Sequence, residues 1–462
     1  MAHILLSAAH KSSGKTTISI GLCAAFNARG LQVHPFKKGP DYIDPMWLSR
    51  AAGHPCHTLD FYTSTHAEIL HTVAQHHHQS DLSLIEGNKG LYDGLDLKGS
   101  NSNAALAKFL HAPVILVLDA RGMTRGIAPL VLGYQHFDAE VNIAGVILNQ
   151  VGGSRHEGKL RRIMEHYTDV PVLGAVQRDP ALDLEERHLG LMPSNEDHLA
   201  TEKISAIGNA IATQVDLDQL LSIAQDAELP AIAPPSVSAS IGLKTEKKLR
   251  IGIAQDAAFG FYYPSDLQAL QDAGAELISI NTLKDTQLPK IDGLFIGGGF
   301  PETQMKALEA NTQLRFEIHQ AIENGLPCYA ECGGLMYLSN AIHWQGQRCE
   351  MVGIIPAETE MHPRPQGRGY VRLQENSDSL WPRAGSAEIA AHEFHYSALS
   401  GLEHNPAFKF AYQVKRGVGI NGQHDGLIYK NLMACYSHQR NSQQNPWTRR
   451  FIDFVHRCQT PK

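Results

Sequence analysis

Short apolar runs alternate with segments of helical periodicity in two long stretches of the chain. Such alternation is typical of βαβ units, in which helices join parallel strands. The first stretch predicts strands at Ile4–Ala8, Leu82–Glu86, Val114–Asp119, Ala144–Asn149 and Val172–Val176. The second predicts strands at Leu249–Ala254, Gly293–Ile296 and Pro327–Ala330, then β-like alternation over 351–436 and a helix over 447–458. We therefore expect an α/β fold with a parallel sheet in each stretch.

The helical spacing of apolar residues stops after Leu229, and Pro230, Pro234 and Pro235 follow among Ala and Ser. Proline cannot continue a helix or a central strand, so this segment is interpreted as an interdomain linker. A chain of 462 residues is also too long for one ordinary core. The expected division is a first domain at 1–228, a linker at 229–248 and a second domain at 249–462.

Composition narrows the class of protein without indicating a partner. Hydrophobic residues make up 43% of the chain and the net charge is -7, so no overall nucleic-acid footprint is present. The seven cysteines lack metal-ligand spacing and are interpreted as reduced thiols. The start of the chain lacks a signal-peptide pattern, and no apolar run has the length of a membrane span. We expect a cytoplasmic protein, with the histidines at 76–78 on an exposed helix end.

A phosphate-binding loop is predicted between the first strand and the first helix. The segment from Ala9 to Thr16 has this pattern, with Ala where the first glycine is usual. Backbone N–H groups of such a loop bind phosphates, the Lys15 ammonium balances their charge, and the Thr16 hydroxyl can bind Mg²⁺. The candidate ATP-binding residues are Ser12, Ser13, Gly14, Lys15, Thr16 and Thr17.

Carboxylates for Mg²⁺ are expected where strands end near this loop. Glu86 ends a predicted strand, and Asp41 and Asp44 follow a short strand at Val33–Phe36. Asp93 lies in the glycine-containing segment after Glu86. The alternative for Asp41 and Asp93 is that each only caps a turn.

A thiol nucleophile is predicted at Cys332, where a strand meets the glycines Gly333 and Gly334. Such a turn exposes the sulfur, and the following helix N-terminus favours the thiolate. Cys328, inside the strand, is assigned to the core. The general base can come from 392–395 or from 436–438, and the residues alone leave both open. The glycine loop at 297–299 offers backbone N–H donors for an oxyanion, and we expect them at Gly298, Gly299 and Gly333.

With both sites in place, the chain resembles the cobyrinate a,c-diamide synthase family over essentially its whole length. The resemblance rests on long matches. They are Gly39-Pro40-Asp41-Tyr42, Gly90-Leu91-Tyr92-Asp93-Gly94, Phe261-Tyr262-Tyr263-Pro264, Glu331-Cys332-Gly333-Gly334-Leu335-Met336 and His392-Glu393-Phe394-His395. In that family the N-terminal domain is like dethiobiotin synthetase, and the C-terminal domain is a class I glutamine amidotransferase.

The resemblance implies an ATP-, Mg²⁺- and glutamine-dependent ligase that amidates peripheral carboxylates of a corrin-type tetrapyrrole through acyl phosphates. It implies Cys332 as nucleophile and His438 as base, which leaves His392 and His395 as structural or substrate-side residues. We expect Thr16, Asp41 and Glu86 to hold the metal. Residues expected near the substrate are Asp44, Asp93 and Tyr42. A homodimer is one assembly that the resemblance allows.

Two features depart from the usual pattern. Class I amidotransferases have His-x-Glu, whereas this chain has His438-Gln439-Arg440, which resembles the Cys–His dyad of the cobyrinate-type branch and supports that branch. The segment also lacks the second histidine common in the family, and Ala9, Lys11 and Ser13 are unusual in the phosphate loop. The missing second histidine and the unusual phosphate loop suggest instead the sibling branch of the family, which amidates sirohaem. Further alternatives are a partitioning-type ATPase, which has no use for Cys332, and a scaffold with an inactive glutaminase domain.

Overall fold

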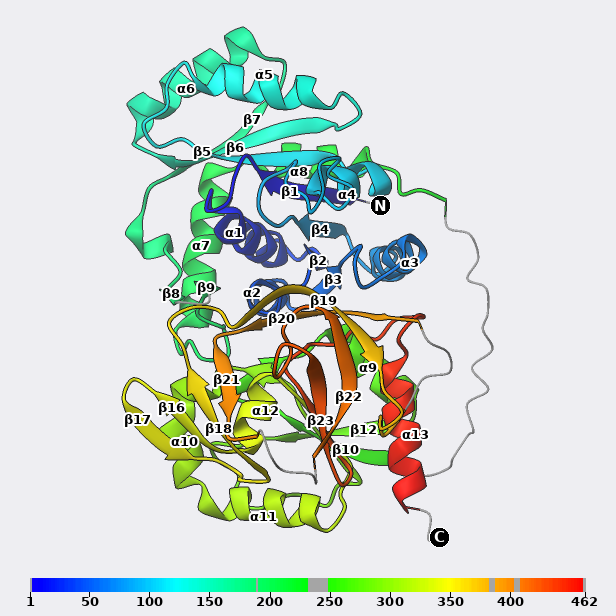
Figure 1. Ribbon diagram of the computed structural model, residues 1–462. Helices are drawn as coiled ribbons and strands as arrows, with labels where there is room; N and C mark the ends of the chain where they lie inside the picture. Colours follow the sequence, from blue (N-terminus) through cyan, green and yellow to red (C-terminus); the bar gives the residue numbers. More distant parts are fainter. Residues whose placement is uncertain (1, 188–189, 232–247, 382–386, 403–407, 460–462) are drawn as a thin grey trace. The chain divides into compact units, whose positions relative to one another are not determined.

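The computed structural model describes residues 2–187, 190–231, 248–381, 387–402 and 408–459. The chain divides into two compact units, Met1–Val237 and Ser238–Lys462 (Figure 1). Most of the linker expected at 229–248 falls outside the described residues. Within the ranges above, every helix is too short or too polar to span a lipid bilayer.

The N-terminal unit contains a sheet with the strand order β3-β2-β4-β1-β5-β6-β7, in which all neighbouring strands are parallel. The strands are β1 (Ala2–Ala8), β2 (Val33–Lys38), β3 (His57–Leu59), β4 (Leu82–Glu86), β5 (Val114–Asp119), β6 (Ile143–Val151) and β7 (Val172–Gln177). The α/β fold predicted from the apolar runs is confirmed. Since β1, β2 and β4 are parallel neighbours, the loops that follow them meet at one edge of the sheet.

Helices cover both faces of this sheet, so the unit has three layers. In β1, Ile4 and Leu6 face one core and Leu5 faces the other. The first core is closed by α1 (Lys15–Ala28), α2 (Ile43–Ala52), α7 (Ala200–Gln214) and α8 (Leu217–Gln225). The second is closed by α3 (His66–His77), α4 (Asn103–Leu110), α5 (Ile127–Phe137) and α6 (Ser154–Tyr167). Short elements are η1 (Pro180–Leu182), β8 (Glu186–Arg187) and β9 (Gly190–Leu191).

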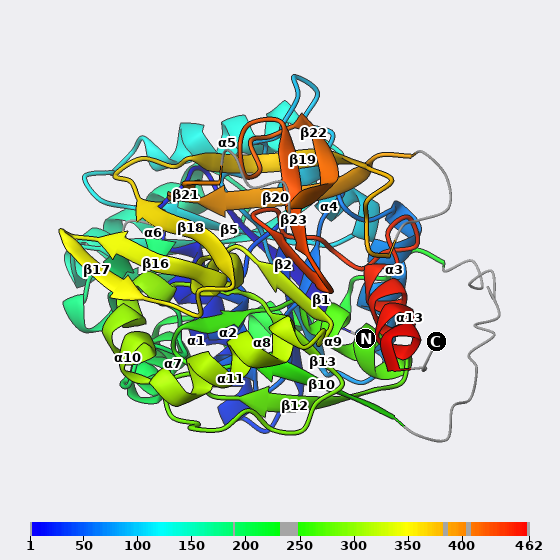
Figure 2. The same cartoon turned by 60° about the horizontal axis from the view of Figure 1, so that its bottom comes forward.

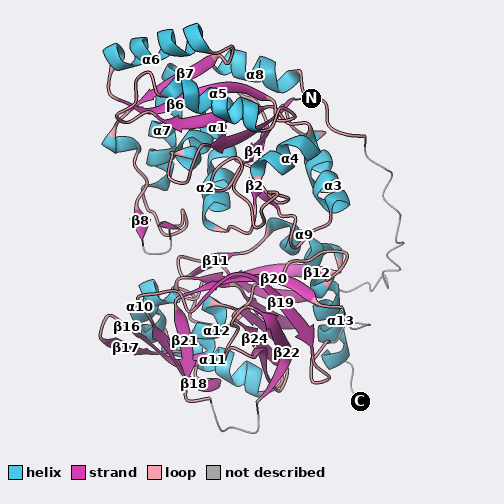
Figure 3. Ribbon diagram, turned by 45° about the horizontal axis from the view of Figure 1, so that its top comes forward, coloured by secondary structure: helices cyan, strands magenta, loops and turns pink. Residues whose placement is uncertain are grey.

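The C-terminal unit has a mixed sheet with the order β12-β10-β13-β15-β24-β23-β22-β19-β20 (Figure 3). It is parallel from β12 to β24 and antiparallel beyond. The parallel strands are β12 (Ala275–Ile280), β10 (Leu249–Ala254), β13 (Gly293–Ile296), β15 (Cys328–Glu331) and β24 (Leu432–Cys435). The others are β23 (His424–Tyr429), β22 (Lys409–Arg416), β19 (Gly367–Glu375) and β20 (Ile389–His395).

Helices and smaller sheets cover this second sheet. One face packs on α9 (Pro264–Asp272) and α13 (Trp447–Gln459), which lie side by side in Figure 2. The other face packs on α10 (Met305–Ala310), α11 (Thr312–Glu323) and α12 (Gly333–Leu338). A four-stranded sheet contains β16 (Ser339–Trp344), β17 (Gln347–Glu350), β18 (Ile355–Met361) and β21 (Ser397–Ser400). The remaining elements are β11 (Phe259–Phe261), β14 (Gly298–Gly299) and η2 (Pro301–Gln304).

Histidines stack against each other beside β2 and β3. The His34 ring lies 4.3 Å from that of His54, and the His57 ring lies 4.0 Å from that of His76. Burial, then the neighbouring His54 and His76, lower the pKa of His34 to about 4. The expectation that residues 76–78 decorate an exposed helix end is wrong for His77, which is buried with Nδ1 3.0 Å from the Ser83 hydroxyl.

The N-terminal unit should lose stability as the pH falls below about 6.5. Between its ordinary pKa and about 4, His34 stays neutral in the folded chain but binds a proton in the unfolded chain. Proton binding lowers the free energy of the unfolded state, so the folded state loses stability over this pH range. Denaturant unfolding at pH 7 and pH 5 should show wild type losing about 1–2 kcal/mol more than His34→Phe. His136→Phe changes an exposed histidine of α5 and serves as control; equal losses in all three proteins would contradict the prediction.

Candidate functional site

The loop between β1 and α1 has the backbone geometry of a phosphate-binding loop. Ser12 and Gly14 have positive φ angles of 64° and 86°. A Cβ on Gly14 would lie 2.0 Å from Nδ2 of Asn149, so both conformation and space require glycine here. Asn149, at the end of β6, donates to the Ser13 carbonyl at 3.0 Å and ties the loop to the sheet. The sequence analysis did not single out Asn149.

Lys15 begins α1, and its side chain crosses to the segment that follows β4. It is buried, and Nζ donates to the Lys89 carbonyl at 2.7 Å. Burial lowers the pKa of Lys15, and the nearby Glu86 carboxylate offsets part of that shift. Asn103 supports the same segment, because its Nδ2 donates to the Asn88 and Gly90 carbonyls.

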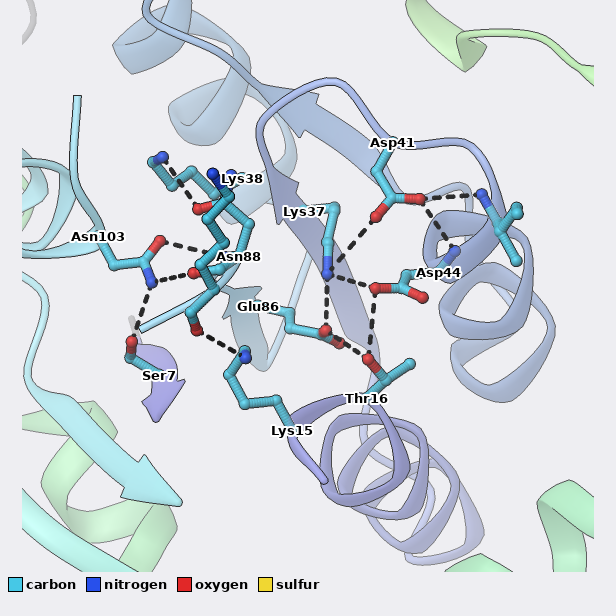
Figure 4. A network of polar contacts seen from close by, with 12 residues as sticks. Ser7, Lys15, Thr16, Lys37, Lys38, Asp41, Asp44, Glu86, Asn88 and Asn103 are labelled. Atoms are coloured by element: carbon cyan, nitrogen blue, oxygen red, sulfur yellow. Dashed lines mark hydrogen bonds and ion pairs between the residues drawn. The ribbon is translucent and has the colours of Figure 1, made fainter. Parts of the chain in front are cut away.

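Lys37, near the end of β2, is a buried cation surrounded by carboxylates (Figure 4). Its Nζ lies 2.7 Å from Glu86 Oε1, 2.5 Å from Asp44 Oδ2 and 3.8 Å from Asp41 Oδ2. Burial acts to lower the pKa of Lys37, but the carboxylates outweigh it and raise the pKa well above its usual value. The sequence motif contained Lys37 but did not assign it a role; its signal was a lysine in an otherwise buried strand.

Thr16 faces the same carboxylates. Its hydroxyl donates to Glu86 Oε1 at 2.9 Å and to Asp44 Oδ2 at 3.3 Å. The other Glu86 oxygen, Oε2, is buried without a hydrogen-bond partner in the described residues. Burial acts to raise the pKa of Asp44, but Lys37 outweighs it and the net shift is downward. Thr16, Asp44 and Glu86 thus form a set of hard oxygen donors.

Such a set fits Mg²⁺, which binds through one or two carboxylates together with substrate phosphates. The described residues contain no group of three or more His, Cys, Asp or Glu side chains arranged to hold an ion by themselves. A magnesium ion here would therefore need oxygen ligands from a bound nucleotide as well. This is the usual situation for nucleotide-bound magnesium.

The other predicted residues lie at turns around this cluster. Asp41 caps α2, since its Oδ1 accepts from the amides of Ile43 and Asp44. Burial and the Asp44 carboxylate raise the pKa of Asp41 to about 7. Asp93 Oδ2 accepts from the Gly90 amide at 2.9 Å, and Tyr42 is buried at the start of α2. Both aspartates therefore do cap turns, as the simpler alternative held.

Cys332 lies at the sharp turn between β15 and α12. Its φ and ψ angles are 47° and -101°, and its amide donates to the Cys435 carbonyl at 2.7 Å. A Cβ on Gly334 would lie 2.2 Å from the Ile296 carbonyl oxygen, and one on Gly333 would lie 2.9 Å from the Gly299 amide. Glycine is needed at both positions for the helix to leave the strand at once.

His438 follows β24 and lies against Cys332. The two side chains are hydrogen-bonded, and a Cβ on Gly298 would lie 2.7 Å from His438 Cε1. Burial acts to lower the pKa of His438, but the hydrogen bonds to Cys332 and Glu331 outweigh it and raise the pKa to about 10. This arrangement favours an imidazolium next to the thiol group.

The two other candidate histidines, His392 and His395, contact residues of the segment 436–438. His392 exchanges backbone hydrogen bonds with His438, and the two rings stack 5.0 Å apart. His395 stacks on Tyr436 with centroids 4.0 Å apart, and its Nδ1 lies 2.8 Å from the Ser397 carbonyl. These contacts are those expected of residues that support the Cys332–His438 pair.

The glycine loop after β13 approaches the same turn. Gly298 and Gly299 form β14, which pairs with β11. The Gly297 amide, which was not among the expected donors, donates to the Tyr262 hydroxyl at 2.9 Å. Gly298, Gly299 and Gly333 remain the candidate donors beside Cys332.

Comparisons with known proteins give a match in each of the two units. Residues 6–191 match the family described as the CobQ/CobB/MinD/ParA nucleotide binding domain, and residues 250–446 match the CobB/CobQ-like glutamine amidotransferase domain. The chain is 46% identical to the cobyrinate a,c-diamide synthase of Magnetococcus marinus, over 94% of this chain and 93% of the relative. Identity is 40% to the synthase of that name from Methanosarcina acetivorans, over 94% of this chain and 91% of the relative.

Proposed function

This chain belongs to the cobyrinate a,c-diamide synthase family, and we propose that it amidates peripheral carboxylates of cobyrinic acid with ATP and glutamine. The observation that carries the proposal is that one chain has both a thiol–imidazole pair and a phosphate-binding loop. The relatives' name supports a corrin substrate over sirohaem. The two sites supply the two half-reactions that amidation requires.

Cys332 and His438 would release ammonia from glutamine. His438 holds the proton of the Cys332 thiol, the thiolate attacks the side-chain amide carbon, and the imidazolium gives that proton to the departing nitrogen. The raised pKa of His438 supports this role, because the histidine then holds a proton at neutral pH. Water then hydrolyses the thioester. Backbone amides of Gly298, Gly299 and Gly333 are the proposed donors to the oxyanion.

The N-terminal site would activate the substrate carboxylate. A carboxylate is a poor electrophile, but transfer of the γ-phosphoryl group of ATP to it gives an acyl phosphate and ADP. Ammonia then attacks the acyl carbon and releases phosphate. Lys15 and the amides of residues 12–17 would position the phosphates and neutralise their charge. Mg²⁺, when bound, would add positive charge at the phosphates, and Thr16, Asp44 and Glu86 are its proposed ligands. The hydrogen bonds of Thr16 favour Asp44 over Asp41 in this role.

Residues near the activated carboxylate are proposed from their place at the carboxyl edge of the N-terminal sheet. Asp93 and Tyr42 lie in the segments after β4 and β2, at the edge where the phosphate loop also lies. Asp41 would act on this site indirectly, through Lys37, because its Oδ2 lies 3.8 Å from Lys37 Nζ. A homodimer would be compatible with this arrangement, because each chain has both sites.

Replacing Cys332 with Ala should reduce glutamine-dependent amidation by more than about 10³-fold, because the nucleophile is lost. Amidation with a high concentration of ammonium should continue, since Cys332 does not act on the acyl phosphate. The measurement is the rate of amide formation with glutamine and, separately, with ammonium as the nitrogen source. Cys458→Ala removes an exposed thiol and should leave both rates unchanged. A folded Cys332→Ala protein that lost both activities would contradict the division of labour.

Replacing Lys15 with Ala should lower amide formation by about 10²–10³-fold with either nitrogen source, because the charge of the transferring phosphoryl group is no longer balanced. ADP release should fall in parallel, while slow glutamine hydrolysis at Cys332 can persist. The control is Lys159→Ala, an exposed lysine of α6. Full ADP-coupled amidation by Lys15→Ala would rule out this role.

The substrate is tested by mass spectrometry of reactions that contain ATP, Mg²⁺, glutamine and either cobyrinic acid or sirohaem. Cobyrinic acid should gain amide nitrogen, and each conversion changes its mass by the difference between OH and NH₂. If only sirohaem were amidated, the chain would have the activity of the sirohaem-amidating branch instead. Amidation of neither compound, with an unrelated acid amidated instead, would reject a tetrapyrrole substrate but not the amidotransferase chemistry.

A further inference from the structure

Glu331, which directly precedes Cys332, is a buried carboxylate in contact with His438. Its side chain is 3% exposed, and Oε2 lies 3.3 Å from His438 Nδ1. The other oxygen, Oε1, accepts from the Tyr329 hydroxyl at 2.7 Å and from the Gln439 amide at 3.0 Å. Two donors thus anchor one oxygen, which leaves the second facing the imidazole.

The residues immediately after the histidine do not supply a carboxylate. Arg440 stands where the His-x-Glu pattern has its acid, and its guanidinium lies over the Tyr263 ring, 4.9 Å from the centroid. The Gln439 side chain is held by Asn445, whose Nδ2 donates to Oε1 at 3.0 Å. Glu331 reaches His438 from a different strand, β15, which neighbours β24 in the sheet.

The other groups around the His438 ring cannot replace this carboxylate. They include Cys332, which is the proposed nucleophile, and His392, which stacks on the ring. Arg440 is a cation that acts on His392. Burial, then His438 and Arg440, hold the pKa of His392 well below its usual value, so His392 is a neutral ring. Among the described groups around the ring, Glu331 is thus the carboxylate that can balance an imidazolium.

We propose that Glu331 is the positioning residue of the glutaminase site, supplying the acid of a Cys–His–Glu triad from the position before the nucleophile. Its Oε2 accepts a hydrogen bond from the Nδ1–H group of His438. This contact holds the ring with Nε2 toward Cys332, favours the tautomer with the proton on Nδ1, and stabilises the imidazolium. This inference rests on the proposed glutaminase function.

Glu331→Gln is the decisive variant, because the amide has the same shape and its oxygen can still accept from Tyr329 and Gln439. Its NH₂ group would face Nδ1 and favour the opposite tautomer, with Nε2–H toward the thiol. The kcat for glutamine hydrolysis should fall by about 10²–10⁴-fold, as expected for a wrong tautomer. The KM for glutamine and ammonium-dependent amidation should change little.

The pH dependence separates this role from simple structural support. Without the carboxylate the imidazolium is less stable, so alkylation of Cys332 by iodoacetamide should begin at a higher pH in Glu331→Gln than in wild type. Glu331→Asp keeps the charge and should recover part of kcat. The matched control is Glu393→Gln, a buried glutamate of β20 that accepts from the amides of Val418 and Gly419. It should leave the alkylation profile unchanged.

A folded Glu331→Gln protein with wild-type kcat and an unshifted alkylation profile would overturn the proposal. If this variant does not fold, Glu331→Asp decides, since a wild-type kcat and profile there would also reject a position-sensitive role. Failure of the proposed function has a different signature. In that case the wild-type protein itself would show no glutamine hydrolysis that depends on Cys332.

Discussion

Both sites depend on a turn in which a buried parallel strand passes into a helix through a positive φ angle. In the N-terminal unit the residue at this position is Gly14, for which φ of 86° carries no steric penalty. In the C-terminal unit it is Cys332, and a side chain at φ of 47° costs about 1–3 kcal/mol. The hydrogen bond of its amide to Cys435, on the neighbouring strand, helps to hold this conformation. Each turn places its reactive groups at the carboxyl edge of its own sheet.

Buried charges near each turn are arranged in opposite-charge contacts. In the N-terminal unit Lys37 faces Glu86 and Asp44, and in the C-terminal unit Glu331 faces His438. A buried charge is costly unless it is paired and hydrogen-bonded, so removing one partner leaves the other uncompensated. These groups are therefore held in fixed positions before any ligand binds. Such preorganisation is what phosphoryl transfer and thiol chemistry require, because both rely on charges that are already in place.

The proposed position of the acid, Glu331, accounts for the departure from the His-x-Glu pattern. With Arg440 over Tyr263, the segment after His438 contributes backbone and packing, and the acid comes from the last residue of β15, directly before Cys332. The proposed nucleophile and acid are then adjacent residues at the end of β15, and only the histidine comes from another segment. The spacing of the triad along the chain can change in this way while the side chains that meet stay the same.

The sequence alone determined the elements whose signals are local. Apolar runs located most strands of the N-terminal sheet and the strands β10, β13 and β15 of the C-terminal sheet, but not β3, β12 or β24. The Gly14-Lys15-Thr16 and Cys332-Gly333-Gly334 segments located the two turns. Tertiary structure alone decided which side chains meet. It brought Asp44 to Thr16, used the Gly297 amide internally, buried His77, and joined Lys37 to Glu86 and Glu331 to His438. The physical reason is range: backbone turns and burial patterns arise between neighbours in sequence, whereas these partners come from separate strands, helices and loops, whose packing against one another no local pattern specifies.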